Sequence, residues 1–249
     1  MILRGSMGLG DAIYLYPVVK YYSERGEDVT IVTRYPEIFA GLNCKTVLES
    51  DFIDCQNSSR TIIEGTNIFE DTLIMAKVEE KLPLKIEYPG EKRIFPTSKK
   101  VCVIRTPSAP AKGEANSTVM IPDVLVFQKI INAFKDKVFF VLLGKQINCK
   151  TVLSGVDLDC SHETGIYNAL ATIDGADLIL AQPGHFVAMA EALGKKLFTI
   201  FASAGLLTQE KRFRFNTPAK ILSRKESVWC VDDEPANNYL RKFEALLNA

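Results

Sequence analysis

The chain has 249 residues, of which 47% are hydrophobic and 24% charged, and its formal net charge at pH 7 is +0. These proportions are typical of a globular protein of one or two domains, and the balanced charge does not favour nonspecific binding to a polyanion. No apolar run reaches the roughly 18 residues of a membrane span, and the first residues lack the pattern of a secretory signal.

The six cysteines contain no CxxC pair, and the two histidines form no HxxxH pair. We interpret the cysteines as reduced, mainly structural thiols, because a core of this size does not depend on disulfides. The sequence therefore predicts a cytoplasmic protein and gives little support for a zinc site.

Short apolar runs alternate along the chain with segments of helical periodicity. We expect strands at residues 1–4, 29–33, 46–48, 100–105, 138–143, 178–181, 197–201 and 221–222. We expect helices at residues 11–25, 123–134, 166–174, 185–194 and 235–247. Nearly continuous apolar strands that alternate with helices are typical of parallel sheets covered on both faces, so the predicted class is α/β.

The alternation weakens over residues 85–100, KIEYPGEKRIFPTSKK, which are polar and include two prolines and a glycine. We interpret this stretch as a linker between an N-terminal domain, residues 1–98, and a C-terminal domain, residues 99–249. The last expected helix is compatible with either domain. Parallel sheets bind ligands outside the carboxyl ends of their strands, so two facing domains would form a cleft with one substrate on each wall.

The first glycine-rich segment, RGSMGLGD, lies between the first expected strand and the first expected helix. It lacks the Lys-Ser or Lys-Thr of a P-loop, and Ile13 occupies the third glycine position of the dinucleotide fingerprint. Asp11 puts a carboxylate where a helix N-terminus would otherwise attract a phosphate. Gly8 and Gly10 would instead let the backbone approach another ligand closely.

Asp11 has two compatible interpretations, a helix N-cap or a general base that takes a proton from a hydroxyl nucleophile. Pro17 lies inside the same helical pattern and removes an N–H. We therefore expect the regular helix to begin near Pro17, after an irregular turn over residues 11–16.

Polar groups follow several expected strands of the second half. Arg105, Thr106 and Lys112 combine hydroxyl and cationic groups that suit a diphosphate, although a solvated loop has the same composition. Gly144 ends the next strand. Glu163 is a candidate acceptor for ribose hydroxyls, whereas the segment up to Thr164 is equally compatible with a helix cap.

Residues 176–202, ADLILAQPGHFVAMAEALGKKLFTIFA, predict a strand, a turn at residues 182–184, a helix and a further strand. This helix has no carboxylate before Glu191, so its N-terminus favours an anion, and His185 adds a donor. A capping or surface role is the alternative for His185. Residues 208–225 contain six Lys and Arg, one Glu and two Phe, which fits a solvated loop, a sugar-phosphate contact or a nucleic-acid track.

These segments together resemble a known family. The opening RGSMGLGDAIYLYPVVKYY resembles the GxGD…P start of the family 9 glycosyltransferases, the ADP-heptose:lipopolysaccharide heptosyltransferase group. DLILAQPGHFVAMAEALGKKLFTIFA is similar to that family's second signature, an Asp-x-Gly turn before an Ala-rich helix, although Gln182 stands where an acidic residue is usual. GVDLDCSHETGIYNALATIDGADLIL resembles the segment that precedes it.

The resemblance implies a GT-B fold with two Rossmann-like domains, inverting transfer from a nucleotide-sugar, and no metal or other cofactor. It implies that Asp11 is the base and that the C-terminal domain holds the nucleotide. The predicted binding residues are Gly8, Gly10, Arg105, Thr106, Lys112, Gly144, Glu163, Thr164, Gln182, Gly184 and His185. The expected partners are a nucleotide-sugar donor and a hydroxyl-bearing acceptor, either a saccharide or lipopolysaccharide or a modified nucleic-acid base.

Two alternatives remain open from the sequence. The basic segment at 208–225 motivates a glycosyltransferase that modifies nucleic-acid bases. Gln182, at a position where the family usually has an acidic residue, motivates a non-catalytic nucleotide-sugar-binding protein.

Overall fold

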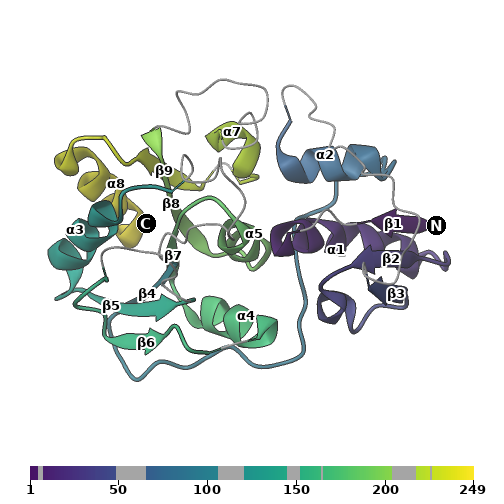
Figure 1. The fold of residues 1–249 in the computed structure, drawn as a ribbon, viewed down its shortest axis with the longest axis horizontal. Coiled ribbons are helices and arrows are strands. Elements are labelled where there is room, and N and C mark those ends of the chain that lie inside the picture. Colours follow the sequence, from purple (N-terminus) through teal and green to yellow (C-terminus); the bar gives the residue numbers. More distant parts are fainter. Residues whose placement is uncertain are drawn as a thin grey trace.

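The computed structural model describes residues 1–4, 8–48, 66–105, 121–144, 152–163, 165–203, 217–224 and 226–249. Its first sheet has the order β1-β2-β3 and is parallel throughout. The strands are β1 (Ile2–Arg4), β2 (Thr30–Thr33) and β3 (Lys45–Leu48). The helices beside them are α1 (Leu9–Glu24), the 3-10 helix η1 (Pro36–Phe39) and α2 (Ile68–Met75) (Figure 1).

The second sheet has the order β6-β5-β4-β7-β8-β9 and is also parallel. Its strands are β4 (Lys100–Arg105), β5 (Val138–Leu143), β6 (Leu158–Cys160), β7 (Leu178–Ala181), β8 (Lys196–Phe201) and β9 (Val228–Val231). Its helices are α3 (Val124–Phe134), α4 (Ile166–Gly175), α5 (His185–Ala192), α7 (Pro218–Ile221) and α8 (Ala236–Asn248). The predicted α/β class with two parallel-sheet units is confirmed.

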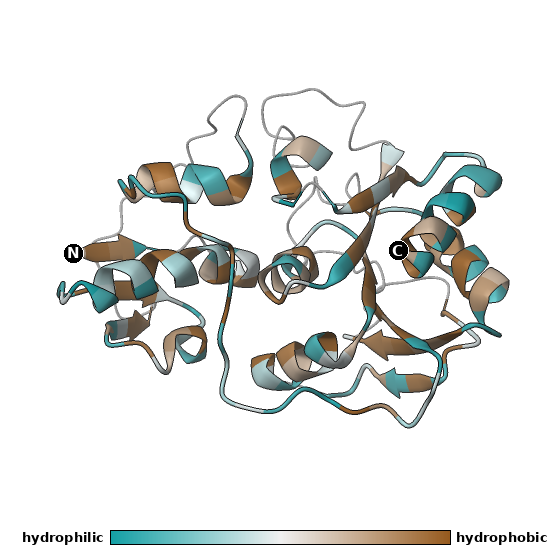
Figure 2. Ribbon diagram, turned by 180° about the vertical axis from the view of Figure 1, so that it is seen from behind, coloured by the Kyte–Doolittle hydropathy of each residue, from teal (hydrophilic) through white to brown (hydrophobic). Residues whose placement is uncertain are grey.

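The central strands of the second sheet are apolar on both faces because helices cover both. Along β4, Val101 and Val103 belong to the hydrophobic cluster that contains residues of α4 and α5. Cys102 and Ile104 alternate with them and belong to the cluster beneath α3 and α8. Figure 2 shows these strands as almost wholly hydrophobic, whereas α3 and α8 alternate between hydrophobic and hydrophilic residues. Double coverage therefore explains the continuous apolar runs in the sequence.

Helix α1 connects the two sheets through a shared core. Residues 12–19 of α1 are all buried, as is Tyr22. The helix contacts α5 of the second unit, as well as α2 and η1. The buried residues of α1, the first sheet, α5 and one face of the second sheet consequently form one continuous cluster.

Several local predictions were wrong. Helix α1 is continuous from Leu9 and includes Pro17, because burial by tertiary contacts outweighs the lost backbone hydrogen bond. The expected strand at residues 221–222 is instead the end of α7, which begins at Pro218, a favourable first helical residue. The strands β6 and β9 and the helix α2 were not predicted.

Residues 76–99 join α2 to β4 without a helix or strand and pass along α4 (Figure 1). The domain boundary at residue 98 stays a proposal that this connection supports. Helix α8 corresponds to the last predicted helix, which the sequence assigned to neither domain. It packs against α3 and against β8 and β9 of the second sheet. Within the described ranges, no helix has the length and apolar character that crossing a membrane requires.

Candidate active site at the α1–α5 junction

The N-terminus of α1 is held by its own carboxylate. Gly8 is the N-cap, and its backbone N–H donates to Asp11 Oδ2 at 3.2 Å. Asp11 is therefore the third helical residue, whose side chain reaches back in a capping box, and not the N-cap that the sequence suggested. Its side chain is partly exposed, so a capping role leaves room for contact with a ligand.

The first turns of α1 and α5 meet at Gly10. A Cβ atom built on Gly10 would lie 3.4 Å from His185 Cα and 3.8 Å from Ala188 Cβ. The sequence predicts that Gly10 admits a ligand, but the space left by its missing side chain instead admits helix α5. The two loops that the sequence singled out, GLGD and QPGH, are thus brought together, and we call this region the α1–α5 junction.

The N-terminus of α5 has no acidic residue and no side-chain cap among the described contacts. Gly184 is its N-cap, with a φ of +150° and no heavy atom within 4 Å of the position that a Cβ would occupy. Free N–H groups and the helix dipole favour a negative charge at such an end. The junction therefore combines one acidic helix terminus with one that suits an anion.

Arg105 brings a positive charge to the same place from the carboxyl end of β4. Its guanidinium carbon lies 5.4 Å from the centroid of the Phe186 ring, on the first turn of α5. A Cβ on Gly144, at the end of β5, would lie 2.5 Å from Arg105 Nη1. Gly144 thus leaves the space in which the Arg105 side chain lies, and its φ of +83° also favours glycine.

His185 is the first residue of α5, and its ring packs against Phe186 with 5.0 Å between centroids. Burial, together with the charge of Arg105, lowers the pKa of His185 from 6.5 to about 4. At neutral pH the imidazole is uncharged, so it offers a single N–H to a ligand and no positive charge.

Gln182 follows β7 at the edge of the same turn. Its side-chain Oε1 is buried and has no hydrogen-bond partner within the described part of the chain. A buried amide oxygen without a donor is energetically costly, which is typical of a ligand-binding position.

Glu163 lies outside this group of contacts. Its carboxylate accepts a hydrogen bond from Arg93 Nη1 at 2.7 Å, and this ion pair lowers the pKa of Glu163. Arg93 belongs to the connection between the sheets, so the first role of Glu163 in the structure is to anchor that connection. Thr106, Lys112 and Thr164 lie outside the described residues, as do residues 204–216 and Lys225 of the basic region.

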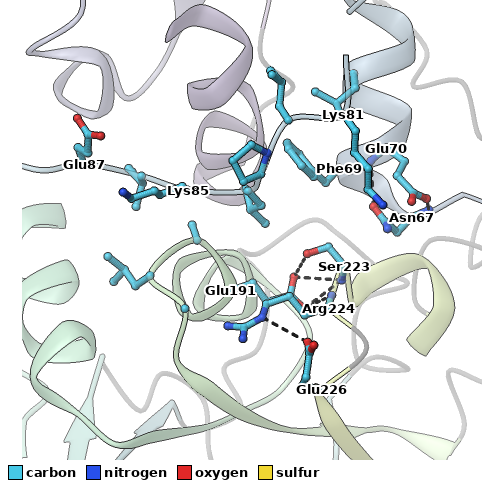
Figure 3. Close-up of a pocket in the computed structure, with 18 of the residues that line it drawn as sticks. Asn67, Phe69, Glu70, Lys81, Lys85, Glu87, Glu191, Ser223, Arg224 and Glu226 are labelled. Atoms are coloured by element: carbon cyan, nitrogen blue, oxygen red, sulfur yellow. Dashed lines mark hydrogen bonds and ion pairs between the residues drawn. The ribbon is translucent and has the colours of Figure 1, made fainter. Parts of the chain in front are cut away.

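A separate cavity of about 1120 Å³ lies at the other end of α5. Its walls come from α2, from residues 81–88 and from the segment around Arg224 (Figure 3). None of the predicted site residues lines it. Sequence reasoning missed this cavity, because the fold assembles its walls from segments that are far apart in the chain.

Glu191, beside this cavity, is 2% exposed and is surrounded by donors. Its carboxylate accepts hydrogen bonds from Ser223, Arg224 and Ser227. Burial nevertheless raises its pKa. Glu191 thus attaches the segment around Arg224 to α5. The sequence pointed to this residue only as the first carboxylate of an Ala-rich helix.

Among the described residues, no three His, Cys, Asp or Glu side chains are grouped so as to hold a metal ion.

No family model and no curated protein matches the chain, but several solved structures do. A family 9 glycosyltransferase from Veillonella parvula superposes with a TM-score of 0.65 at 9% identity, covering 99% of this chain and 96% of that chain. E. coli ADP-heptose LPS heptosyltransferase II gives a TM-score of 0.60 at 13% identity, covering 99% and 98%.

The iron-containing dodecameric glycosyltransferase TibC from enterotoxigenic E. coli gives a TM-score of 0.54 at 12% identity. That match covers 80% of this chain and only 57% of TibC. At these identities the similarity concerns the fold alone. The chain therefore has a fold like that of the family 9 glycosyltransferases and the ADP-heptose LPS heptosyltransferases.

Proposed function

We propose that this chain is a glycosyltransferase that moves a sugar from a nucleotide-sugar to an acceptor hydroxyl, with inversion at the anomeric carbon. The observation that supports this most is the α1–α5 junction. There, the Gly10 backbone of the Asp11 helix lies against His185 of the helix that suits an anion. A base and a site for a departing diphosphate are the two elements that such a transfer needs.

In the proposed reaction, Asp11 accepts the proton of the acceptor hydroxyl. The acceptor oxygen forms a bond to the anomeric carbon while the bond from that carbon to the diphosphate oxygen breaks. The nucleoside diphosphate leaves with the bonding electron pair. The backbone N–H groups at the start of α5 and the Arg105 guanidinium stabilise the charge that develops on it.

We assign the remaining predicted residues to binding of the nucleotide-sugar. Neutral His185 donates one N–H toward the diphosphate, and the amide of Gln182 contacts the donor. Thr106, Lys112, Glu163 and Thr164 stay predicted contacts of the nucleotide. Solved structures of E. coli WaaC with ADP and of TibC with ADP-D-beta-D-heptose make a nucleotide-sugar the first donor class to test.

The decisive variants separate the capping role of Asp11 from its role as a base. Asp11→Asn keeps an oxygen that accepts the Gly8 N–H, whereas Asp11→Ala removes both roles. We expect both variants to lose at least about 100-fold in transfer rate, the usual contribution of a general base. Only Asp11→Ala also removes the acceptor of the Gly8 N–H, so it alone should lose about 1 kcal/mol of stability.

Glu70→Ala is the matched control. Glu70 occupies the equivalent third position of α2, where its carboxylate accepts the Asn67 N–H at 2.9 Å. This variant should lose a similar amount of stability while keeping its transfer rate. If Asp11→Asn turned over at the wild-type rate, Asp11 would not be the base and would only cap the helix.

Metal independence stays a prediction, since TibC is described as iron-containing. Full turnover in the presence of EDTA would support it.

The alternative of a nucleic-acid-modifying enzyme rests on the cations of the basic segment. One of them, Lys220, is not available to a nucleic acid, because it is 5% exposed and paired with Asp71. Duplex binding that weakens steeply with salt would revive this alternative. Tight nucleotide-sugar binding without turnover, over a broad donor panel, would favour the non-catalytic alternative.

A further inference from the structure

A buried ion pair joins the two halves of the molecule. Lys220 on α7 and Asp71 on α2 have Nζ and Oδ2 atoms 2.6 Å apart. The residues are only 5% and 3% exposed. Helix α2 lies beside the first sheet, and α7 lies in the chain between β8 and β9 of the second, so this contact crosses between the two units (Figure 1).

The pair has further hydrogen bonds. Lys220 Nζ donates to the Thr66 carbonyl oxygen at 2.7 Å, and Thr66 Oγ1 donates to Asp71 Oδ1. A buried ion pair with such partners is stable only in one geometry, and removing one partner leaves an uncompensated charge. The cluster therefore holds α2 and α7 in a single arrangement.

The contact continues from α7 to the candidate site. Directly after α7, the backbone N–H groups of Ser223 and Arg224 donate to the Glu191 carboxylate at 3.0 and 3.2 Å. Ser223 Oγ donates to the same carboxylate at 2.5 Å. Glu191 belongs to α5, whose first residue is His185. The ion pair, the short stretch of chain from Lys220 to Ser223 and these hydrogen bonds thus link α2 to the helix that forms one side of the α1–α5 junction.

The junction is flanked by a polar contact on each side. In Figure 1, α2 and α7 face each other above it and α4 lies below. On the α4 side, the Tyr167 hydroxyl donates to the Glu37 carbonyl oxygen of η1. Rotation of one sheet unit about the α1–α5 contact would separate the groups on one side, and on the upper side that means breaking the buried ion pair.

We propose that Lys220 and Asp71 are positioning residues that keep the two halves of the active site in register. This rests on the proposed function, in which the base is on α1 and the leaving group is bound by α5. The pair touches neither substrate, and acts by keeping the Asp11 end of α1 opposite the His185 end of α5 without any ligand.

The test is amide hydrogen exchange of the full chain without ligand, comparing wild type with Lys220→Met. We expect the amides of α2 and α7 to exchange on the order of 100-fold faster in the variant. The amides of α3 and α8, in the core of the second unit, should keep their wild-type rates. No acceleration, or equal acceleration in all four helices, would overturn the proposal, since the pair would then be dispensable or only support global stability.

Two further variants make the comparison decisive. Lys137→Met removes an ion pair with Glu244 whose side chains are 66% and 48% exposed, so it should change none of these rates. Asp71→Asn keeps the shape and a carbonyl acceptor, and it decides the question if Lys220→Met does not fold. A smaller acceleration confined to α2 and α7 is expected for it, and wild-type exchange would count against the pair.

Turnover gives an independent readout. Lys220→Met should lower kcat at least tenfold while leaving the dissociation constant of the nucleotide-sugar within twofold, because the anion site lies within the second unit. Equal loss of binding and turnover would contradict a positioning role. If the wild type transfers no sugar, the proposed function fails while the exchange experiment still decides whether the pair holds the two units together.

Discussion

At the scale of single residues, the junction depends on charges that modify one another. Burial lowers the pKa of His185, and the positive charge of Arg105, which lies close to α5, acts in the same direction. The result is a site with one permanent cation and one neutral donor. A diphosphate would meet the fixed charge of Arg105 and not a charge that varies with pH.

The titration of His185 gives a pH prediction. An unfolded imidazole binds its proton below 6.5, whereas folded His185 does so only near its pKa of about 4. Stability is therefore complete above pH 6.5 and is lost as the pH falls toward 4, by up to about 3 kcal/mol. Denaturant unfolding at a series of pH values should show this loss, and His185→Gln should show less of it. The same slope in both proteins would contradict the assignment.

The space for Arg105 gives a second prediction at this scale. Gly144→Ala and Gly155→Ala both put a side chain at a positive φ, +83° and +74°. Each should lose about 1–2 kcal/mol of stability. Only the Cβ at position 144 meets the Arg105 guanidinium, whereas that at 155 lies 3.5 Å from Ile131. Nucleotide-sugar affinity, measured by calorimetry, should therefore fall in Gly144→Ala alone, and an equal fall in both would show that Arg105 is not the cause.

At the scale of elements, α1 is a central helix that is buried on all sides over residues 12–19 and not an amphipathic surface helix. Its tyrosines and aliphatic residues pack against the first sheet, α2 and α5. Only its first turn reaches the candidate site. Its position there depends on the absence of a side chain at Gly10.

Enlarging residue 10 should separate the two helices. Gly10→Leu improves helix propensity, so any loss of stability must come from contact with α5. We expect a loss of about 1–3 kcal/mol, together with reduced turnover. Gly41→Leu is the control, because no heavy atom lies within 4 Å of a Cβ there. Thermal denaturation compares the two, and equal stability would show that α5 yields without cost.

At the scale of the whole molecule, the connection between the sheets is a fixed part of the structure. The Arg93 N–H donates to the Ala171 carbonyl oxygen of α4 at 2.9 Å, and the Arg93 guanidinium pairs with Glu163. Gly175, at the end of α4, contacts the Arg93 carbonyl so closely that a Cβ would overlap it. The connection therefore follows one path along α4.

Gly175→Ala should displace this path. Because the obstacle is backbone and not a flexible side chain, we expect a loss of about 1–3 kcal/mol. Glu163→Gln weakens the same attachment, so the double variant should lose less than the sum of the two single losses. Urea denaturation of the four proteins measures this. Strict additivity would mean that the two residues hold the connection independently.

The sequence by itself determined the class of fold and most of its central strands. Residues 100–105, 138–143 and 178–181 are strands with the predicted bounds, because strands buried on both faces are apolar throughout. The edge strands β6 and β9 have one neighbour each and include exposed residues such as Asp159 and Trp229. They therefore lack the continuous apolar run that predicts a strand. The family resemblance likewise came from local motifs, and the shared fold bears it out.

Only the tertiary structure decided what those motifs do. The sequence predicts that Gly10 leaves space for a ligand, whereas in the structure that space is occupied by α5. The sequence could not show this, because α5 comes from a distant part of the chain. Lys220 was one cation in a basic segment and became half of a buried ion pair, because Asp71 lies on a helix that the sequence did not reveal. Local patterns report which segments are strands and helices, whereas pairings between distant segments depend on how the two sheet units pack.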